Sequence, residues 1–73
     1  MTLENIRQAL SDKGLKVTPQ RQIILEAIYT LDNHPTAEQI IEYVKETHPN
    51  VAIGTVYKVL DVLVEHGLIK SKN

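Results

Sequence analysis

The sequence predicts a mainly α-helical fold with a small β-wing: a winged helix-turn-helix of four helices plus a truncated wing strand. Three observations predict this class. Apolar residues recur at spacings of three and four along nearly the whole chain, which is the helical period. A turn of about five residues joins the last two predicted helices. A short apolar segment with the character of a strand then follows the last helix.

The first predicted helix runs from Thr2 or Leu3 to Lys13. Its apolar residues recur at helical spacing, and they are Leu3, Ile6 and Leu10. Gly14 follows at the position where a left-handed C-terminal cap ends a helix. Residues 15–17 are expected to form a short extended connector.

The second helix starts with Thr18 and Pro19, a hydroxyl N-cap followed by proline at the first helical position. Its predicted buried stripe contains Ile24, Ala27, Ile28 and Leu31, with Ile23 alongside. The sequence Asp-Asn-His-Pro at 32–35 is expected to break this helix.

The third helix is expected to start after Thr36, because Gln39 three residues later completes a capping-box pattern. Its buried face is predicted to contain Ile40, Ile41 and Val44, and residues 47–50 end it. The fourth helix is expected from about Ile53 to His66, with Gly67 as its C-terminal cap. Its predicted core face contains Ile53, Val56, Leu60, Leu63 and Val64.

Residues 68–70 are too few for a helix and are predicted to begin the wing strand. A lone strand cannot form a hairpin, so this wing is incomplete without a further segment. We therefore expect residues 1–73 to be one winged-helix domain from a longer protein.

Composition excludes several classes of protein. The 73 residues are 42% hydrophobic, which suffices for one modest core. There is no cysteine, so these residues contain no disulfide, thiolate zinc site or cysteine nucleophile. No apolar run reaches the roughly 18 residues of a membrane span, and Met1 opens a polar stretch rather than a signal peptide. We therefore expect no membrane partner.

The outward face of the fourth helix offers groups that suit DNA. It is predicted to present Thr55, Lys58 and Val62, with Gly54 to one side and Tyr57 at its border; Asp61 and Val59 lie near it. Lysine can bind a guanine edge or a phosphate, a tyrosine ring can contact a thymine methyl group, and a threonine hydroxyl can bind phosphate. Glycine near a helix N-terminus lets backbone N–H groups approach a phosphate closely. An ordinary surface helix can show the same pattern.

The formal net charge of −1 argues against nucleic acid, whose binders usually carry a basic excess. The distribution of charge answers this objection. Acidic residues are expected on the second and third helices, at Glu26, Asp32, Glu38, Glu42 and Glu46. Basic residues lie around the first connector, on the fourth helix and on the wing, at Lys13, Lys16, Arg21, Lys58, Lys70 and Lys72. A winged helix can bring these basic groups to one side.

Several motifs together resemble the Fur family of metal-dependent transcriptional regulators, and the resemblance covers essentially the whole chain. They occur in the family's order and spacing, as GLKVTPQR at 14–21, HPTAE at 34–38, TVYKVL at 55–60 and GLI at 67–69. The His-Pro-Thr-Ala and Pro-Asn segments look most like the peroxide-sensing branch. The Tyr-Lys-Val-Leu segment at 57–60 looks more like the iron-sensing branch, which typically carries arginine in place of Lys58. The branch therefore stays open.

The resemblance implies a two-domain repressor whose N-terminal winged helix binds a palindromic, A·T-rich operator in double-stranded DNA. The fourth helix would be the recognition helix, with Tyr57 and Lys58 at base-contacting positions and Thr55 nearby. Lys16 matches a residue that enters the minor groove, and Arg21 matches a position that contacts the DNA backbone. Two positions depart from the family pattern: Lys58 lacks the bidentate fork of arginine, and Gly54 stands where alanine is common.

The resemblance also implies metal control and dimerisation. His34 matches the one ligand that the DNA-binding half contributes to a regulatory Fe or Mn site. The remaining ligands, structural Zn and the homodimer contacts would come from a C-terminal domain outside residues 1–73, so we expect this chain alone to bind no cofactor. Such a regulator would be cytoplasmic. Without the resemblance, His34 is simply a turn residue before Pro35.

Two other classes of function are alternatives to DNA binding. A winged helix can instead be a protein-interaction module, because one fold hosts several functions. An enzyme is disfavoured, since the chain has no cysteine, no Gly-rich phosphate loop and no evident partner for a triad histidine. The carboxylates of the third helix fit a solvated face better than a catalytic pair.

Overall fold

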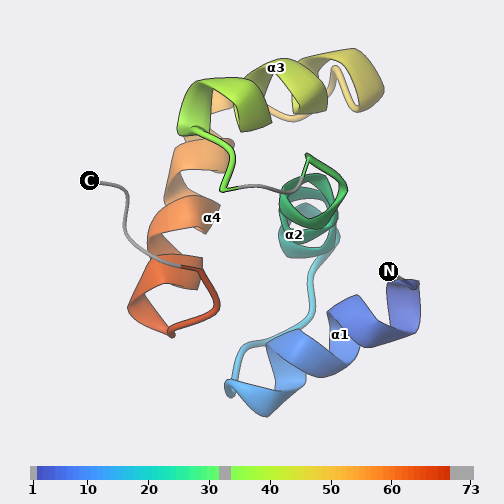
Figure 1. The fold of residues 1–73 in the computed structure, drawn as a ribbon, viewed down its shortest axis with the longest axis vertical. Coiled ribbons are helices and arrows are strands. Elements are labelled where there is room, and N and C mark those ends of the chain that lie inside the picture. The colour runs from blue at the N-terminus through green and yellow to red at the C-terminus, as the bar shows by residue number, and fades with distance from the viewer. Residues whose placement is uncertain (1, 32–33, 70–73) are drawn as a thin grey trace.

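The computed structural model describes residues 2–31 and 34–69, which form four α-helices around one core (Figure 1). They are α1 (Leu3–Asp12), α2 (Pro19–Leu31), α3 (Ala37–Thr47) and α4 (Ile53–Glu65). The four predicted helices and the mainly α class are therefore confirmed. The longest described helices have 13 residues and none has the length and apolar composition to cross a membrane, which takes about 20 residues.

The predicted wing strand is not seen in the described part of the chain. Leu68 and Ile69 form a bend rather than a strand, and Lys70 lies outside the described residues. The physical reason is that a strand is held by hydrogen bonds to a neighbouring strand, and no strand exists within 2–31 and 34–69 to pair with. Leu68 and Ile69 instead pack, half-buried, against the core.

Threonine hydroxyls cap the first three helices at their N-termini, as two of the predicted motifs require. The Thr18 hydroxyl accepts a hydrogen bond from the Arg21 amide at 3.2 Å, and the Thr36 hydroxyl accepts one from the Gln39 amide at 3.1 Å. The Gln39 side chain in turn accepts a bond from the Thr36 amide at 2.8 Å, which completes the predicted capping box. Thr2 caps α1 in the same way through the Asn5 amide.

Both predicted glycine caps are confirmed. Gly14 and Gly67 have φ values of 76° and 77°, in the left-handed region that glycine enters without a steric penalty. At the C-terminal end of α1, the Gly14 amide donates to the Ser11 carbonyl oxygen and the Leu15 amide donates to the Leu10 carbonyl oxygen. At the C-terminal end of α4, the Gly67 amide donates to the Val64 carbonyl oxygen and the Leu68 amide donates to the Leu63 carbonyl oxygen. This pair of hydrogen bonds at each helix end is the Schellman motif, in which the leucine after the glycine packs back against the core.

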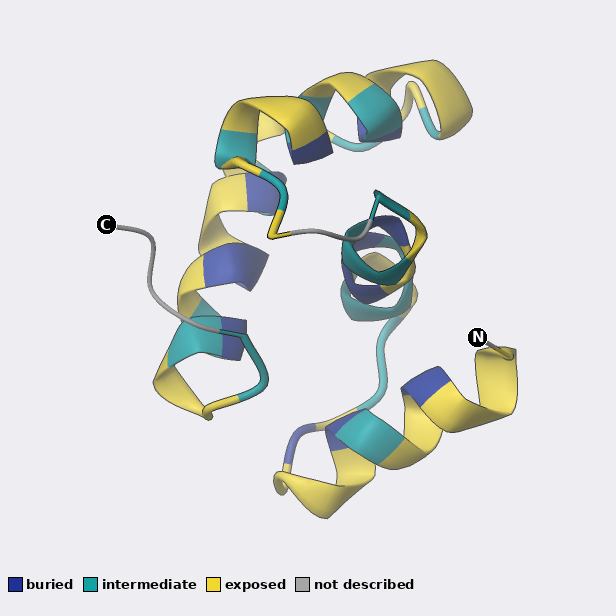
Figure 2. Cartoon of the chain, viewed as in Figure 1, coloured by how far each residue is buried: buried dark blue, intermediate teal, exposed yellow. Residues whose placement is uncertain are grey.

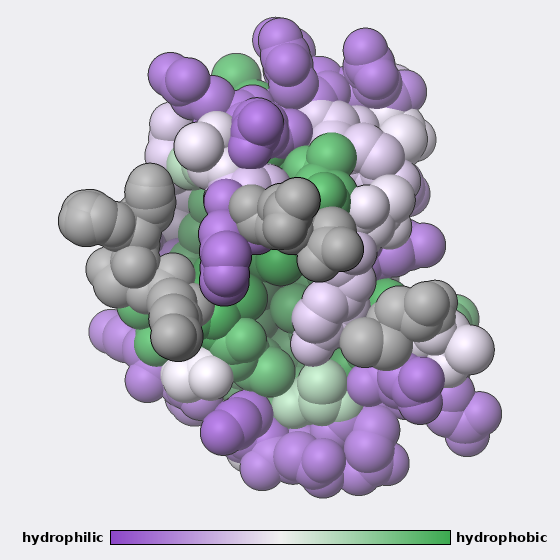
Figure 3. Space-filling model, viewed as in Figure 1, coloured by the Kyte–Doolittle hydropathy of each residue, from purple (hydrophilic) through white to green (hydrophobic). Residues whose placement is uncertain are grey.

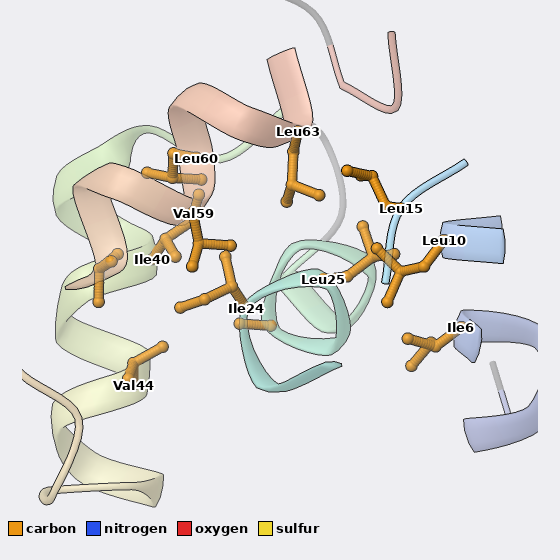
Figure 4. Packing of buried hydrophobic residues seen from close by; sticks show 12 residues of the cluster. Ile6, Leu10, Leu15, Ile24, Leu25, Ile40, Val44, Val59, Leu60 and Leu63 are labelled. Carbon is orange, nitrogen blue, oxygen red and sulfur yellow. The ribbon is translucent and has the colours of Figure 1, made fainter. Parts of the chain in front are cut away.

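Helix α2 lies at the centre of the molecule and packs against each of the other three helices (Figure 1). Figure 4 shows Val59 and Leu63 of α4 pointing toward Ile24 and Leu25 of α2. The buried core comprises Ile6, Leu10, Leu15, Ile24, Leu25, Ala27, Ile40, Val44, Val56, Val59, Leu60 and Leu63. Leu25 was not in the predicted stripe of α2 although it is fully buried, because helices on several sides of α2 bury more than one stripe. The predicted core residues Ile28, Leu31 and Ile41 are half-buried at its edge.

Candidate nucleic-acid interface

Helix α4 has one buried and one exposed face (Figure 2). The buried face points toward α2 and carries Val56, Val59, Leu60 and Leu63. The exposed face carries Ile53, Gly54, Tyr57, Lys58, Asp61 and Glu65. Of the predicted contact residues on this helix, Gly54, Tyr57 and Lys58 therefore share the exposed face.

The buried face is rotated by roughly 40° from the predicted one, counting 100° per residue. Ile53 was predicted in the core but is 47% exposed, and Val59 was placed near the exposed side but is only 8% exposed. Thr55 and Val64 are both half-buried at the flanks of the helix. Apolar residues cover most of the circumference of α4, so its period alone leaves the buried direction open. Packing against α2 decides it.

The N-terminus of α4 is open, unlike those of the other three helices. Its N-cap residue is Ala52, whose side chain makes no capping hydrogen bond, so the first amides of the helix bond to no side chain of the described residues. A β-carbon placed on Gly54 would meet nothing within 4 Å, which shows that the surface here is unobstructed. Backbone N–H groups and the helix dipole make such an end a binding site for anions.

Charge separates the two halves of the exposed α4 face. The N-terminal half carries Lys58 and no acidic residue, whereas the C-terminal half carries the exposed carboxylates of Asp61 and Glu65. A polyanion is therefore attracted to the first two turns and repelled by the last two. Recognition helices of helix-turn-helix proteins contact bases mainly through their N-terminal residues, which matches this polarity.

The connector between α1 and α2 is held at both ends and presents Lys16 to solvent. Leu15 is 8% exposed and its amide donates to Leu10, which fixes the start of the connector. One Arg21 guanidinium nitrogen donates to the Lys16 carbonyl oxygen at 2.8 Å, which fixes the next residue. Sequence reasoning placed both Lys16 and Arg21 at the interface but missed their link. The signal was available, since side chains in the first turn of a helix point back toward its N-terminus.

The ends of α1 and α4 lie close together. The ammonium nitrogen of Lys13 is 3.9 Å from the position of a β-carbon on Gly67, at the C-terminal cap of α4. A cation there is favourable because the C-terminal end of a helix carries partial negative charge. The positive charge of Lys13 therefore lies beside the C-terminal end of α4.

His34 lies on the turn between α2 and α3, and its backbone is in a conformation that few non-glycine residues adopt. Its φ is 53°, in the left-handed region where histidine is several-fold enriched over most residues, and its side chain is exposed. Within the described residues, no group of three or more histidine, aspartate or glutamate side chains is placed to hold a metal ion. His34 could supply one imidazole nitrogen to such an ion, and the described part of the chain does not complete the ligand set.

The other two histidines make local contacts. His48 Nδ1 lies 2.9 Å from the Thr47 hydroxyl, and His66 Nδ1 lies 2.9 Å from the Val62 carbonyl oxygen. They are the C-cap residues of α3 and α4.

The acidic residues lie on the outside of α3. Glu38, Glu42 and Glu46 are all exposed, and Figure 3 shows hydrophilic residues gathered over this helix. Glu26 of α2 is exposed as well, while Asp32, Lys70 and Lys72 lie outside the described residues. The acids of α3 are thus carried by a different helix from Lys58 and the open N-terminus of α4.

Comparison with known proteins identifies the family. The sequence model of the ferric uptake regulator family matches residues 12–73. A peroxide-responsive repressor PerR of Staphylococcus saprophyticus is 35% identical over 68 residues, which are 93% of this chain and 46% of that protein. A peroxide operon regulator of Bacillus subtilis is 38% identical over 68 residues, which are 93% of this chain and 47% of that protein. The chain thus spans about half the length of these relatives, and it belongs to the ferric uptake regulator family.

Proposed function

We propose that this chain is the sequence-specific DNA-binding part of a metal-responsive transcriptional repressor, and that α4 reads an A·T-rich palindromic operator. One observation carries the proposal: the exposed face of α4 presents Tyr57 and Lys58 next to an uncapped helix N-terminus at Gly54. Family membership supports the same function. The proposal is for a binding function in the cytoplasm and includes no catalytic step.

Each exposed group of α4 has a role in this proposal. The Tyr57 ring contacts base edges in the major groove, and Lys58 binds a guanine edge or a phosphate as a single cation. The amides at Gly54 bind one phosphate oxygen through the open end of the helix. The Thr55 hydroxyl, at the half-buried flank, binds the DNA backbone rather than a base.

Lys16 supplies a second contact, away from α4. We propose that its ammonium group enters a neighbouring minor groove, which is narrow and electronegative in A·T-rich DNA. Arg21 fixes the Lys16 backbone with one guanidinium nitrogen and has further N–H groups with which to bind a phosphate. A contact in each of two grooves would set the orientation of the domain on the duplex.

Regulation requires parts of the protein beyond these residues. We propose that His34 supplies one ligand to a regulatory Fe or Mn ion whose other ligands lie in a C-terminal domain, with structural Zn and the homodimer contacts there as well. An ion held between two domains would fix the spacing of the two DNA-binding units, and that spacing must match the operator half-sites. The names of both relatives, a peroxide-responsive repressor and a peroxide operon regulator, favour peroxide as the stimulus.

A winged-helix protein-interaction module is the alternative, and the exposed acidic row of α3 favours it. A basic protein partner would bind Glu38, Glu42 and Glu46, whereas DNA would be repelled there. An NMR shift map separates the two functions. DNA should perturb residues 53–58 and Lys16, and a basic partner should perturb α3.

A salt titration with an A·T-rich palindromic duplex tests the proposal. Lys58→Ala should weaken binding about tenfold and lower the slope of log K against log salt by about 1, because one phosphate or base contact is lost. Tyr57→Ala should weaken binding by a similar factor with little change in slope, since its ring carries no charge. Leu3→Ala is the matched control, because Leu3 is exposed on α1, which packs against α2 and not α4. Equal affinities for all four proteins would rule out α4 as the DNA-binding element.

A further inference from the structure

Exposed large apolar side chains are few in the described part of the chain, and two of the three adjoin each other on α4. These residues are Leu3 at 56% exposure, Ile53 at 47% and Tyr57 at 49%. Ile53 and Tyr57 are four residues apart on one helix, so their β-carbons are neighbours at about 5–6 Å. Together they form an apolar strip on the exposed face of α4.

Ile53 and Tyr57 lie outside the buried core of the described residues. The core of α4 is made by residues on its other side, and a β-branched side chain in an exposed first turn adds no helix propensity. Ile53 is 47% exposed, so about half of its apolar surface stays in water.

The surroundings of the strip point to a polyanion with apolar groups on its surface. Lys58 follows Tyr57 directly, and the open N-terminus of α4 begins at Ile53 itself. A protein partner for an apolar strip does not require a cation and free backbone amides beside it, whereas a duplex presents phosphates next to base edges. Thymine is the base that adds a methyl group to the floor of the major groove.

We propose that Ile53 is a specificity-determining residue that, together with Tyr57, packs against thymine C5-methyl groups in the operator. Isoleucine has no side-chain hydrogen-bonding group, so it can distinguish bases only through such apolar contacts. This inference rests on the proposed DNA-binding function and extends it, since it names the chemical group that is read. It also assigns the preference for A·T pairs to the major groove as well as to Lys16 in the minor groove.

Removing the thymine methyl group without changing base pairing tests this inference. An A·T-rich palindromic duplex is compared with the same duplex in which deoxyuridine replaces every thymine. The native chain should bind the thymine duplex more tightly, by about fourfold for each methyl group it contacts. Ile53→Ala should lower this thymine-to-uracil ratio by about fourfold. Leu3→Ala, which truncates another exposed large apolar side chain, on α1, should leave the ratio unchanged.

Comparing the thymine-to-uracil affinity ratio of each variant with that of the native chain distinguishes the possible roles of Ile53. An Ile53→Ala chain that binds both duplexes more weakly by the same factor would overturn the inference, because Ile53 would then act on the fold or on a phosphate. An unchanged affinity for both duplexes would overturn it as well, and would point to a protein partner for the strip. Failure of the native chain to bind either duplex would instead contradict the proposed function. Thermal unfolding of both variants confirms that they fold.

Discussion

Helices α3 and α4 are neighbours in sequence and both pack against α2, yet they begin in opposite ways. The first turn of α3 is closed by the reciprocal bonds of Thr36 and Gln39. The first turn of α4 begins at Ala52 and has no side-chain bond. Their outer faces differ as well, since α3 exposes three glutamates and α4 exposes Ile53, Tyr57 and Lys58.

This difference agrees with the proposal that α4, and not α3, contacts the DNA. In the first turn of α3 the Gln39 amide bonds to the Thr36 hydroxyl, and the three exposed glutamates of this helix repel phosphate. The first-turn amides of α4 have no side-chain partner among the described residues, which agrees with the proposed phosphate contact there. Both helices bury apolar side chains against α2, and they differ in their first turns and in their exposed faces.

Truncating one core residue in each helix should show that their inner faces are equivalent. Ile40→Ala in α3 and Leu63→Ala in α4 should each lower the free energy of unfolding by about 2–5 kcal/mol, because both side chains are buried and leave cavities. Urea denaturation measures both. Tyr57→Ala on the exposed side of α4 should cost much less, and a loss as large as that of Leu63→Ala would show that the assigned faces are wrong.

Removing the side-chain cap of α3 should leave its first turn without a capping hydrogen bond, as in α4. Thr36→Ala removes the hydroxyl that accepts from the Gln39 amide, so the free energy of unfolding should fall by about 1 kcal/mol. Thr30→Ala is a matched control, because Thr30 is an exposed residue within α2 and caps no helix. Equal unfolding free energies for the two variants would mean that the capping box adds nothing to stability.

The helix ends could be predicted from sequence because they depend on neighbouring residues. The Thr18-Pro19 start, the Thr36-Gln39 box and the caps at Gly14 and Gly67 each need only a few consecutive residues, and all are confirmed. The wing strand, which is not seen among the described residues, is the contrary case. A strand requires a partner, and the short-range pattern at Leu68 and Ile69 does not contain one.

The candidate site was predicted only in part, for the same physical reason. Tyr57 and Lys58 are exposed as expected, but the direction of the α4 core face depends on how α2 lies against it. Ile53 and Val59 were consequently assigned to the wrong sides of the helix. The ligand role of His34 stays a prediction, and so does every DNA-contact role, at Lys16, Arg21, Gly54, Thr55, Tyr57 and Lys58.

Adding a side-chain cap to α4 should give its first turn a capping hydrogen bond, as in α3. Ala52→Ser supplies a hydroxyl that can accept from an amide of the first turn, and it should raise the free energy of unfolding by about 0.5–1 kcal/mol. The same hydroxyl would compete with a phosphate, so affinity for the duplex should fall about two- to fivefold. Ala52→Val is the control, since valine caps no better than alanine. Increased stability with unchanged affinity would contradict phosphate binding at this end.

Gly54→Ala should give the smallest change in stability. A β-carbon at this position meets nothing within 4 Å and the backbone is helical, so alanine should fit and raise the free energy of unfolding by about 0.5 kcal/mol. Gly67→Ala should have the opposite sign, because its φ of 77° strains any residue with a β-carbon.

The value of Gly54 to the proposed function lies in how closely a phosphate can approach. If the DNA backbone comes near the first amides of α4, the methyl group of alanine must occupy part of that space, and affinity should fall although the helix is more stable. Measuring unfolding and duplex affinity on the same Gly54→Ala protein decides the question. A variant that is more stable and binds as tightly as the native chain would show that the open end of α4 is not used for close phosphate contact. The contrast with α3 would then rest on the side chains of the exposed face alone.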